Sequence, residues 1–381
     1  MRITINCNPL TESLAGIGNY LLSLVKQFEA LRSDLEWRYQ YGMERPRSVL
    51  RSDAALGSVT KTAKGMKEAV ATRAPGLYNL ARSFRRDILV RFAKESDVYF
   101  EPNVIALNFR AKRVVTTVHD FSCYHHPEWH PEERIANFRQ NFLRGIERTD
   151  AIITPSSFVA EEAREYLNWD REIVTIYHGI RDVFLEAVAE ARGPVESDYS
   201  LCVGAVEPRK NLVRLLQAWD NLPQNTVDGQ KLLIVGSKGW KNKDVFSLVE
   251  NMDGRVMFFG GVTDKKLAEL YRNARCLIYP SLYEGFGLPP VEAMACGCPV
   301  VVSSASSLPE VCGDAAQYID PCDVDSMTDG IRQVLDSESN RQRLIQAGKQ
   351  RSKLFSWRKS ALAHIEVFEH ANSHAVISSA S

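Results

Sequence analysis

Several features that would assign this chain to a simple class are missing from its 381 residues. No run of residues reaches the roughly 20 apolar positions of a membrane-spanning helix, and the first residues lack the apolar core of a secretion signal. No internal repeat of short period occurs, which argues against a solenoid. The eight cysteines are scattered without a CxxC pair, so we expect buried reduced thiols and no zinc site. A cytoplasmic protein of about two domains is therefore expected.

An excess of charge of one sign is also missing, because 47 basic residues balance 47 acidic ones, and we expect no nucleic-acid partner. The exception is the segment 61–94, where nine basic residues stand against two acidic ones. Apolar residues recur there at helical spacing beside Arg82, Arg85 and Arg86, which is typical of a basic amphipathic helix on an anionic membrane. The alternative is a helix that packs on the core and exposes a basic face to water.

Short apolar runs alternate with helical patterns along the chain, which is typical of parallel α/β sheets. Strands are predicted at residues 3–6, 98–100, 113–118, 151–154 and 173–177, and then at 201–204, 231–235, 256–259, 276–279 and 299–302. Neither half carries G-x-G-x-x-G after its first strand, which argues against a classical nicotinamide-binding domain.

These patterns divide the chain into two Rossmann-like domains. The first is predicted over residues 1–182 and the second over 200–355, with a linker over 183–199. One more helix is predicted over 356–371, and a tail of small residues over 372–381 is expected to be disordered.

The most informative segment is 283–292 (YEGFGLPPVE), which holds two glutamates eight positions apart. It follows an apolar strand, and its proline pair suits the first turn of a helix, where the missing N–H would be unpaired anyway. The helix should therefore begin near Pro289 or Pro290, with Glu284 in the loop and Glu292 in the first turn. In open α/β sheets, ligands bind in the crevice at the carboxyl ends of the strands.

The loop that precedes this helix is suited to a nucleotide diphosphate. The amides of Phe286, Gly287 and Leu288 would face phosphate oxygens at the positive end of the helix dipole. Glu284 and Glu292 would accept hydrogen bonds from hydroxyl pairs, one on a sugar and one on a ribose. The alternative is that both glutamates complement the helix dipole while exposed to water.

Further polar residues stand at the ends of other predicted strands. Arg209 and Lys210 occupy a strand-to-helix turn, where they would neutralise a diphosphate, although a merely solvated cation is the alternative. His119 ends a strand of the first half, in the crevice facing the second half, where substrate contact is expected, although a lone histidine is usually structural. Gly16 and Gly18 open a helix with a turn that can receive a phosphate or a sugar edge, or that is simply tight.

Together these motifs resemble those of the retaining nucleotide-sugar glycosyltransferases called family four, and the resemblance covers nearly the whole chain. The residues that carry it are 16–20 (GIGNY), 117–120 (TVHD), 153–158 (ITPSSF), 203–212 (VGAVEPRKNL), 284–292 (EGFGLPPVE), 295–301 (ACGCPVV), 308–311 (LPEV) and 355–357 (FSW). The chain is most similar to bacterial enzymes that build O-antigen or capsule chains, many of which transfer mannose from GDP-mannose.

The resemblance implies an α/β fold of two Rossmann-like domains that face each other across a cleft (GT-B), with a C-terminal helix that crosses back to the N-terminal domain. The first domain would bind the acceptor and the second the nucleotide sugar. The implied catalytic residues are His119, Arg209, Lys210 and Glu284. The implied donor-binding residues are Gly16, Gly18, Val262, Phe286, Gly287, Leu288 and Glu292. Many relatives carry an arginine where this chain has Ala205, which would leave the phosphate charge to the cations at 209 and 210.

The implied reaction moves a hexose, mannose from GDP-mannose, with retention onto a growing bacterial surface polysaccharide. The acceptor would be a glycan or a polyprenyl-diphosphate-linked glycan, and the basic segment would hold the protein peripherally on the inner face of the plasma membrane. No cofactor or metal is implied, because no Asp-x-Asp ends a strand and Arg209 and Lys210 would supply the positive charge. The alternatives are a UDP- or dTDP-sugar donor, a nucleotide-sugar 2-epimerase, and a non-catalytic sugar-binding subunit.

Overall fold

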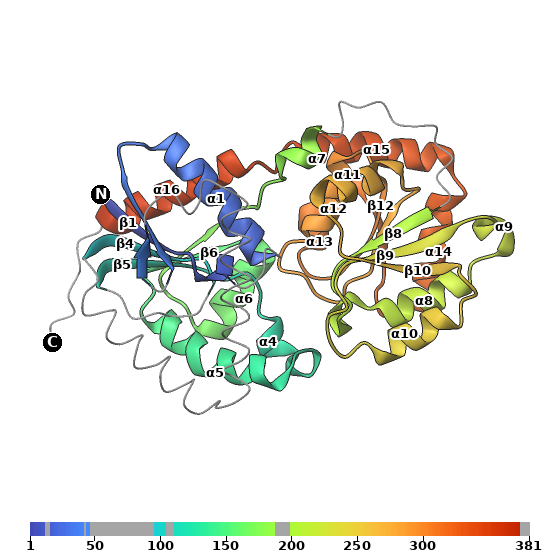
Figure 1. Cartoon of the computed structure of the whole chain (residues 1–381), viewed down its shortest axis with the longest axis horizontal. Helices are drawn as coiled ribbons and strands as arrows, with labels where there is room; N and C mark the ends of the chain where they lie inside the picture. The colour runs from blue at the N-terminus through green and yellow to red at the C-terminus, as the bar shows by residue number, and fades with distance from the viewer. Residues whose placement is uncertain (12–15, 42, 46–94, 104–109, 187–198, 374–381) are drawn as a thin grey trace.

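The computed structural model describes residues 1–11, 16–41, 43–45, 95–103, 110–186 and 199–373. Within these ranges the chain forms two α/β domains that lie side by side (Figure 1). The basic segment 61–94, most of the predicted linker and the last eight residues of the predicted tail lie outside the described residues. The membrane-binding prediction for the basic segment therefore stays a prediction.

The first domain contains the elements β1 (Arg2–Asn6), η1 (Asn8–Thr11), α1 (Ile17–Leu31), β2 (Glu36–Tyr41), β3 (Met43–Arg45), β4 (Ser96–Glu101), β5 (Ala111–Thr117), α4 (Ser122–His125), η3 (Pro127–Trp129), α5 (Glu132–Glu147), β6 (Ala151–Thr154), α6 (Ser157–Leu167) and β7 (Glu172–Thr175). The chain continues with α7 (Asp182–Glu186), β8 (Tyr199–Val203), η4 (Pro208–Lys210), α8 (Leu212–Asp220), α9 (Gln224–Val227), β9 (Lys231–Val235), α10 (Lys243–Glu250), β10 (Val256–Gly260), α11 (Asp264–Asn273), β11 (Leu277–Tyr279), α12 (Leu288–Ala295), β12 (Val300–Ser303), α13 (Leu308–Cys312), η5 (Gly313–Ala315), β13 (Gln317–Ile319), α14 (Val324–Leu335), α15 (Glu338–Ser352) and α16 (Trp357–Ser373).

The sheet of the first domain has the order β3-β2-β1-β4-β5-β6-β7, and among these described strands only the β2–β3 pair is antiparallel. Helices α1 and α16 cover one face, and α5 and α6 cover the other (Figure 1). Phe368 of α16 is fully buried and packs on Phe28 and Phe100. Because burial of one such side chain contributes about 1.5–3 kcal/mol, the last helix belongs to the core of the first domain. The predicted return of the C-terminal helix is confirmed.

The sheet of the second domain has the order β10-β9-β8-β11-β12-β13, and every neighbouring pair is parallel. Helices α8, α10 and α14 cover one face, and α11, α12 and α13 cover the other. Strands β8 and β11 pair at the middle of the sheet, at Leu201 and Leu277. Since neighbouring parallel strands end at the same edge, the loops that follow β8 and β11 meet there.

The predicted fold of two doubly wound domains is confirmed, and each of the ten predicted strands overlaps an observed one. The prediction missed β2, β3 and β13. Seven of the eight cysteines are buried, as expected, and only Cys322 is exposed. In the part of the chain that the structure describes, no helix is both long and apolar enough to cross a membrane.

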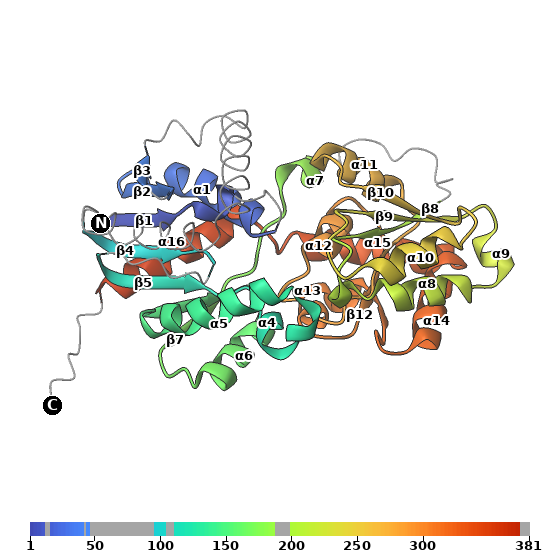
Figure 2. The same ribbon diagram turned by 60° about the horizontal axis from the view of Figure 1, so that its bottom comes forward.

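The two domains contact each other through several polar groups beside the loops that follow β8 and β11. Figures 1 and 2 show α4 of the first domain and α13 of the second between the two sheets. The indole N–H of Trp240 donates to the carbonyl of Trp129 at 2.7 Å, and the ammonium of Lys241 donates to the carbonyl of Glu128. The carboxyl edge of the second sheet therefore faces the first domain.

Candidate active site

The candidate site is built from the loops that follow β8 and β11. The turn after β8 has Gly204 at a φ of +151°, and a Cβ there would lie 3.1 Å from Cε of Lys210. A glycine therefore lets η4 fold back over the strand and bury the Lys210 side chain. Leu282 N–H donates to the carbonyl of Arg209 at 2.8 Å, which ties the loop after β11 to η4.

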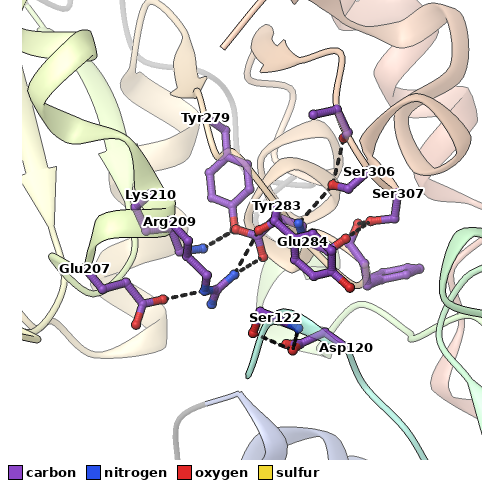
Figure 3. Close-up of polar contacts among 12 residues, drawn as sticks. Asp120, Ser122, Glu207, Arg209, Lys210, Tyr279, Tyr283, Glu284, Ser306 and Ser307 are labelled. Carbon is purple, nitrogen blue, oxygen red and sulfur yellow. Dashed lines mark hydrogen bonds and ion pairs between the residues drawn. The ribbon is translucent and has the colours of Figure 1, made fainter. Parts of the chain in front are cut away.

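A cluster of two cations and two carboxylates lies where the loops after β8 and β11 meet. Figure 3 shows the Arg209 guanidinium between Glu207 and Glu284. Arg209 donates to Glu284 Oε2 at 2.7 Å through one terminal nitrogen, and its Nε lies 2.7 Å from Glu207 Oε1. Lys210 Nζ donates to Glu284 Oε1 at 2.6 Å and to the Tyr279 hydroxyl at 2.6 Å. The Tyr279 hydroxyl donates in turn to Glu284 Oε1 at 2.9 Å. Glu284, Arg209 and Lys210, which the sequence singled out separately, are brought into direct contact.

The pKa values of the cluster follow from burial and from the charges that oppose it. Burial by itself would raise the pKa of Glu284, but the charges of Arg209 and Lys210 outweigh it and lower the pKa to about 2. The pKa of Lys210 is lowered, because desolvation outweighs the attraction of Glu284. The pKa of Arg209 is raised, since its carboxylate neighbours outweigh desolvation. Glu284 is therefore an ionised carboxylate across the physiological range and an acceptor for hydroxyl groups.

The loop from Glu284 to Gly287 is held by serines at the start of α13. Ser307 Oγ lies 2.8 Å from the carbonyl of Glu284 and 3.1 Å from that of Phe286, and donates to them. Glu284 N–H donates to Ser306 Oγ at 2.9 Å. Gly287 has a φ of +102°, a conformation that other residues rarely adopt. The loop therefore reaches α12 in one defined path, with the amides of Phe286, Gly287 and Leu288 at the helix start.

The predicted position of Glu292 needs a correction. Helix α12 begins at Leu288 and has no acidic residue in its first turn, so Glu292 lies in the second turn. The prediction was wrong because the helix begins before the proline pair, which occupies its second and third positions. Glu292 is buried and pairs with one terminal nitrogen of Arg181. The second terminal nitrogen of Arg181 pairs with Asp264. Burial raises the pKa of Glu292 to about 7, although Arg181 opposes this shift.

His119 lies on the side of the site that belongs to the first domain. Its Nε2 is 2.8 Å from the carbonyl of Pro102, and burial lowers its pKa, so the ring is neutral at neutral pH. Its ring meets that of Tyr20 edge to face, with centroids 4.8 Å apart. A Cβ on Gly285 would lie only 1.9 Å from the carbonyl oxygen of His119. His119 and the loop that carries Glu284 are therefore in direct backbone contact across the domain junction.

The remaining predicted residues lie around this centre. Gly16 is exposed at the start of α1 with a φ of +40°, and Gly18 is buried in the first turn of that helix. Val262 follows the edge strand β10 and packs on the core of the second domain. The described contacts do not bring Gly16, Gly18 or Val262 to Glu284, and their roles stay predictions.

Sequence reasoning missed several residues that complete the site. Tyr279, the last residue of a predicted strand, bonds both Lys210 and Glu284. Tyr283 precedes Glu284 and reaches the first domain, where its hydroxyl accepts from Phe121 N–H at 3.0 Å and donates to Glu162 at 2.5 Å. The available signal for Tyr279 was a hydroxyl-bearing residue at the carboxyl end of an apolar strand.

No metal cluster is apparent at this site. Among the residues that the structure describes, no group of three or more His, Cys, Asp and Glu side chains is arranged to hold an ion. Metal independence stays a prediction.

Comparisons with known proteins give consistent matches over both domains. Residues 15–183 match the family model described as Glycosyltransferase Family 4, and residues 186–351 match the model described as Glycosyl transferases group 1. The O-antigen chain mannosyltransferase B of Escherichia coli is 34% identical over 97% of this chain and 100% of its own length. The O-antigen chain mannosyltransferase RfbU of Salmonella typhimurium is 28% identical over 65% of this chain and 67% of its own length.

Solved structures match the arrangement of the two domains. Sucrose-phosphate synthase from Thermosynechococcus elongatus has a TM-score of 0.68 at 20% identity, over 97% of this chain and 98% of its own. WaaG, a glycosyltransferase involved in lipopolysaccharide biosynthesis, has a TM-score of 0.62 at 14% identity, over 97% and 99%. At such identities the likeness concerns the fold.

Proposed function

This chain belongs to glycosyltransferase family 4, and we propose that it transfers mannose from GDP-mannose, with retention, to a growing bacterial surface polysaccharide. The observation that carries the proposal is the contact of Glu284 with both Arg209 and Lys210 at the sheet edge that faces the first domain. The choice of mannose is supported by the similarity to the O-antigen chain mannosyltransferase B, which covers 97% of this chain and 100% of that protein.

The site offers the two kinds of group that a nucleotide sugar needs. In the proposed complex Arg209 and Lys210 bind the diphosphate, and Glu284 accepts hydrogen bonds from hydroxyls of the sugar. Glu292 accepts hydrogen bonds from the two ribose hydroxyls, and His119 contacts the sugar from the first domain. The cations in this partly buried site stabilise the charge that grows on the departing diphosphate, which is where electrostatic catalysis acts most strongly.

In the proposed reaction the bond between the anomeric carbon and the diphosphate oxygen breaks, and the acceptor hydroxyl attacks from the same face. The acceptor proton passes to the departing diphosphate, so no separate base is required. Closure of the two domains over the donor would exclude water, which would otherwise hydrolyse the sugar. The acceptor is proposed to be a glycan carried on a polyprenyl diphosphate at the inner membrane surface.

The donor is tested by thermal shift with GDP-mannose, UDP-sugars and dTDP-sugars. A ligand at about 100 times its Kd stabilises a protein by about 2.7 kcal/mol, so the true donor should raise the melting temperature clearly above the others. Radiolabelled transfer and the anomeric configuration of the product, measured by NMR, then test the reaction and its stereochemistry. Stabilisation only by UDP- or dTDP-sugars would overturn the proposed donor, and an inverted product would overturn retention.

The membrane part of the proposal is tested separately. The protein should sediment with anionic liposomes, and substitution of Arg82, Arg85 and Arg86 by Glu should release it. Neutral liposomes provide the control. Equal sedimentation of the two proteins with anionic liposomes would show that the basic segment does not hold the protein on the membrane.

A further inference from the structure

The motif 153–158 is part of the family resemblance, which implies no role for it. It meets the second domain beside the loop from Glu284 to Gly287, which we call the donor loop. Ser156 caps α6, since its Oγ accepts from Val159 N–H at 3.3 Å. The same hydroxyl donates to the carbonyl of Gly285 at 2.7 Å, and it is fully buried. One side chain thus fixes the start of a helix in the first domain and the position of the Glu284 loop in the second.

The next two residues of the motif bind a carboxylate from the second domain. Ser157 N–H donates to Glu310 Oε1 at 2.8 Å, and Phe158 N–H donates to Glu310 Oε2 at 3.1 Å. The Tyr177 hydroxyl donates to Glu310 Oε1 at 2.9 Å. The first N–H groups of a helix have no partner within the helix and carry its positive dipole end, so a carboxylate is the group that suits them.

Glu310 is itself fixed to the donor loop through short helix α13. Arg351 donates from Nε to the carbonyl of Val311 at 3.0 Å and from a terminal nitrogen to the carbonyl of Glu310, which anchors α13 within the second domain. Ser307, immediately before α13, binds the carbonyls on either side of Gly285. A displacement of Glu310 would therefore be transmitted to the backbone of the loop that carries Glu284.

We infer that Glu310 is a positioning residue for transfer: its carboxylate binds the amino end of α6 in the first domain, and so sets the loop that carries Glu284 against that domain. Three donors of the first domain bind the Glu310 carboxylate. Ser156 adds a hydrogen bond to the carbonyl of Gly285, which holds the two domains in the same relative position. Arg209 and Lys210, the cations proposed to bind the diphosphate, belong to the second domain, so loss of this contact alters how the domains meet without removing these cations. The inference depends on the proposed function only for its kinetic readout.

The test compares Glu310→Gln, Tyr177→Phe and a control, Glu161→Gln. Glutamine keeps the size of the side chain but offers an NH₂ group where one backbone N–H now finds a carboxylate oxygen. Tyr177→Phe removes one of the three donors and leaves both N–H bonds. Glu161 is an exposed carboxylate on α6, the helix whose amino end binds Glu310. Glu161→Gln therefore removes one negative charge without removing the contact at the amino end of α6.

We expect kcat of Glu310→Gln to fall by at least about tenfold, while the Kd for the nucleoside diphosphate stays within about twofold, because the lost contact joins the two domains and leaves Arg209 and Lys210 in place. Tyr177→Phe should fall less, and Glu161→Gln should match the wild type. Hydrogen exchange at the amides of Ser157 and Phe158 should accelerate in Glu310→Gln and stay unchanged in the control.

Three results would overturn the inference: an unchanged kcat in Glu310→Gln, a loss of diphosphate affinity as large as the loss of kcat, or unchanged exchange at the two amides. All variants are assayed with the donor that the wild type uses. Turnover of a sugar nucleotide other than GDP-mannose would therefore overturn the proposed donor and leave this comparison intact.

Discussion

Substitution of Gly285 by Ala tests whether close contact of the two domains is required for transfer. The added Cβ would lie 1.9 Å from the carbonyl oxygen of His119, whereas real Cβ contacts essentially never fall below 3.0 Å, so the atoms must separate by about 1 Å. The other near atoms, the His119 carbonyl carbon and Asp120 Cβ, also belong to the first domain. The strain is therefore relieved by opening the junction. A misplacement of this size can cost about 100-fold in rate, or about 2.7 kcal/mol in the barrier.

The assay measures kcat for transfer, the Kd for the nucleoside diphosphate and the melting temperature of Gly285→Ala. We expect the rate to fall while diphosphate binding and melting stay close to the wild type, since no atom of the second domain is among the three nearest to the added Cβ. Gly287→Ala is the contrasting variant. Its positive φ and its contact with the Leu308 side chain place the strain inside the second domain, so melting and binding should also suffer. A Gly285→Ala enzyme with wild-type kcat would refute the requirement for contact.

Lys210→Ala should lower kcat at least tenfold, about 1.4 kcal/mol in the barrier, and unchanged turnover would mean that the diphosphate lies elsewhere. Burial raises the pKa of Glu162 from 4.5 to about 7, so stability that is present below pH 4.5 is lost as the pH rises to about 7. Glu162→Gln should therefore reduce the fall in the free energy of unfolding between pH 5 and 8, measured by urea denaturation, by at most about 3 kcal/mol. An identical fall in both proteins would exclude this titration. Arg181→Met should raise the pKa of Glu292 further, because Arg181 now opposes the effect of burial. If the ionised Glu292 binds the ribose, the fall in KM for the donor should move to higher pH. An unshifted profile of KM against pH would count against the ribose role.

The core of the site was predictable from the sequence because its signals are local. The glycine loop and the proline pair predict a turn followed by a helix within one short segment, although the helix begins at Leu288, just before the proline pair. The helix η4 lies in the loop after a strand of the same sheet. The order of strands in a parallel sheet then brings two such turns together. The sequence placed Arg209, Lys210 and Glu284 each at a strand end, but their mutual pairing follows from β8 and β11 being neighbours, which no local pattern specifies.

The missed strands have physical reasons. In β2, Trp37 and Tyr39 are buried and alternate with polar residues, so no continuous apolar run marks it. Strand β13 has only three residues and lies at the edge of its sheet. Alternation would have indicated β2, whereas a three-residue edge strand has too little burial to leave a pattern.

The contacts between the domains could not be predicted, because each joins residues far apart in the sequence. Tyr283 and Glu162 are separated by 121 positions, and Glu310 and Phe158 by 152. A tyrosine before Glu284 and a glutamate in a short helix are ordinary residues for their local surroundings. Their function as partners across the junction follows only from the way in which the two sheets face each other.

Charge pairing and domain contact are therefore two separate properties of this site. Arg209 and Lys210 are opposed by Glu207 and Glu284 within the second domain, so the cluster is already neutralised before any donor binds. An incoming diphosphate must exchange with these carboxylates, and the exchange frees Glu284 to accept sugar hydroxyls. The first domain contributes backbone contact at Gly285 and no partner to either cation among the described ion pairs. Changes at the cations should thus alter donor binding and chemistry together, whereas changes at the junction should alter the rate alone.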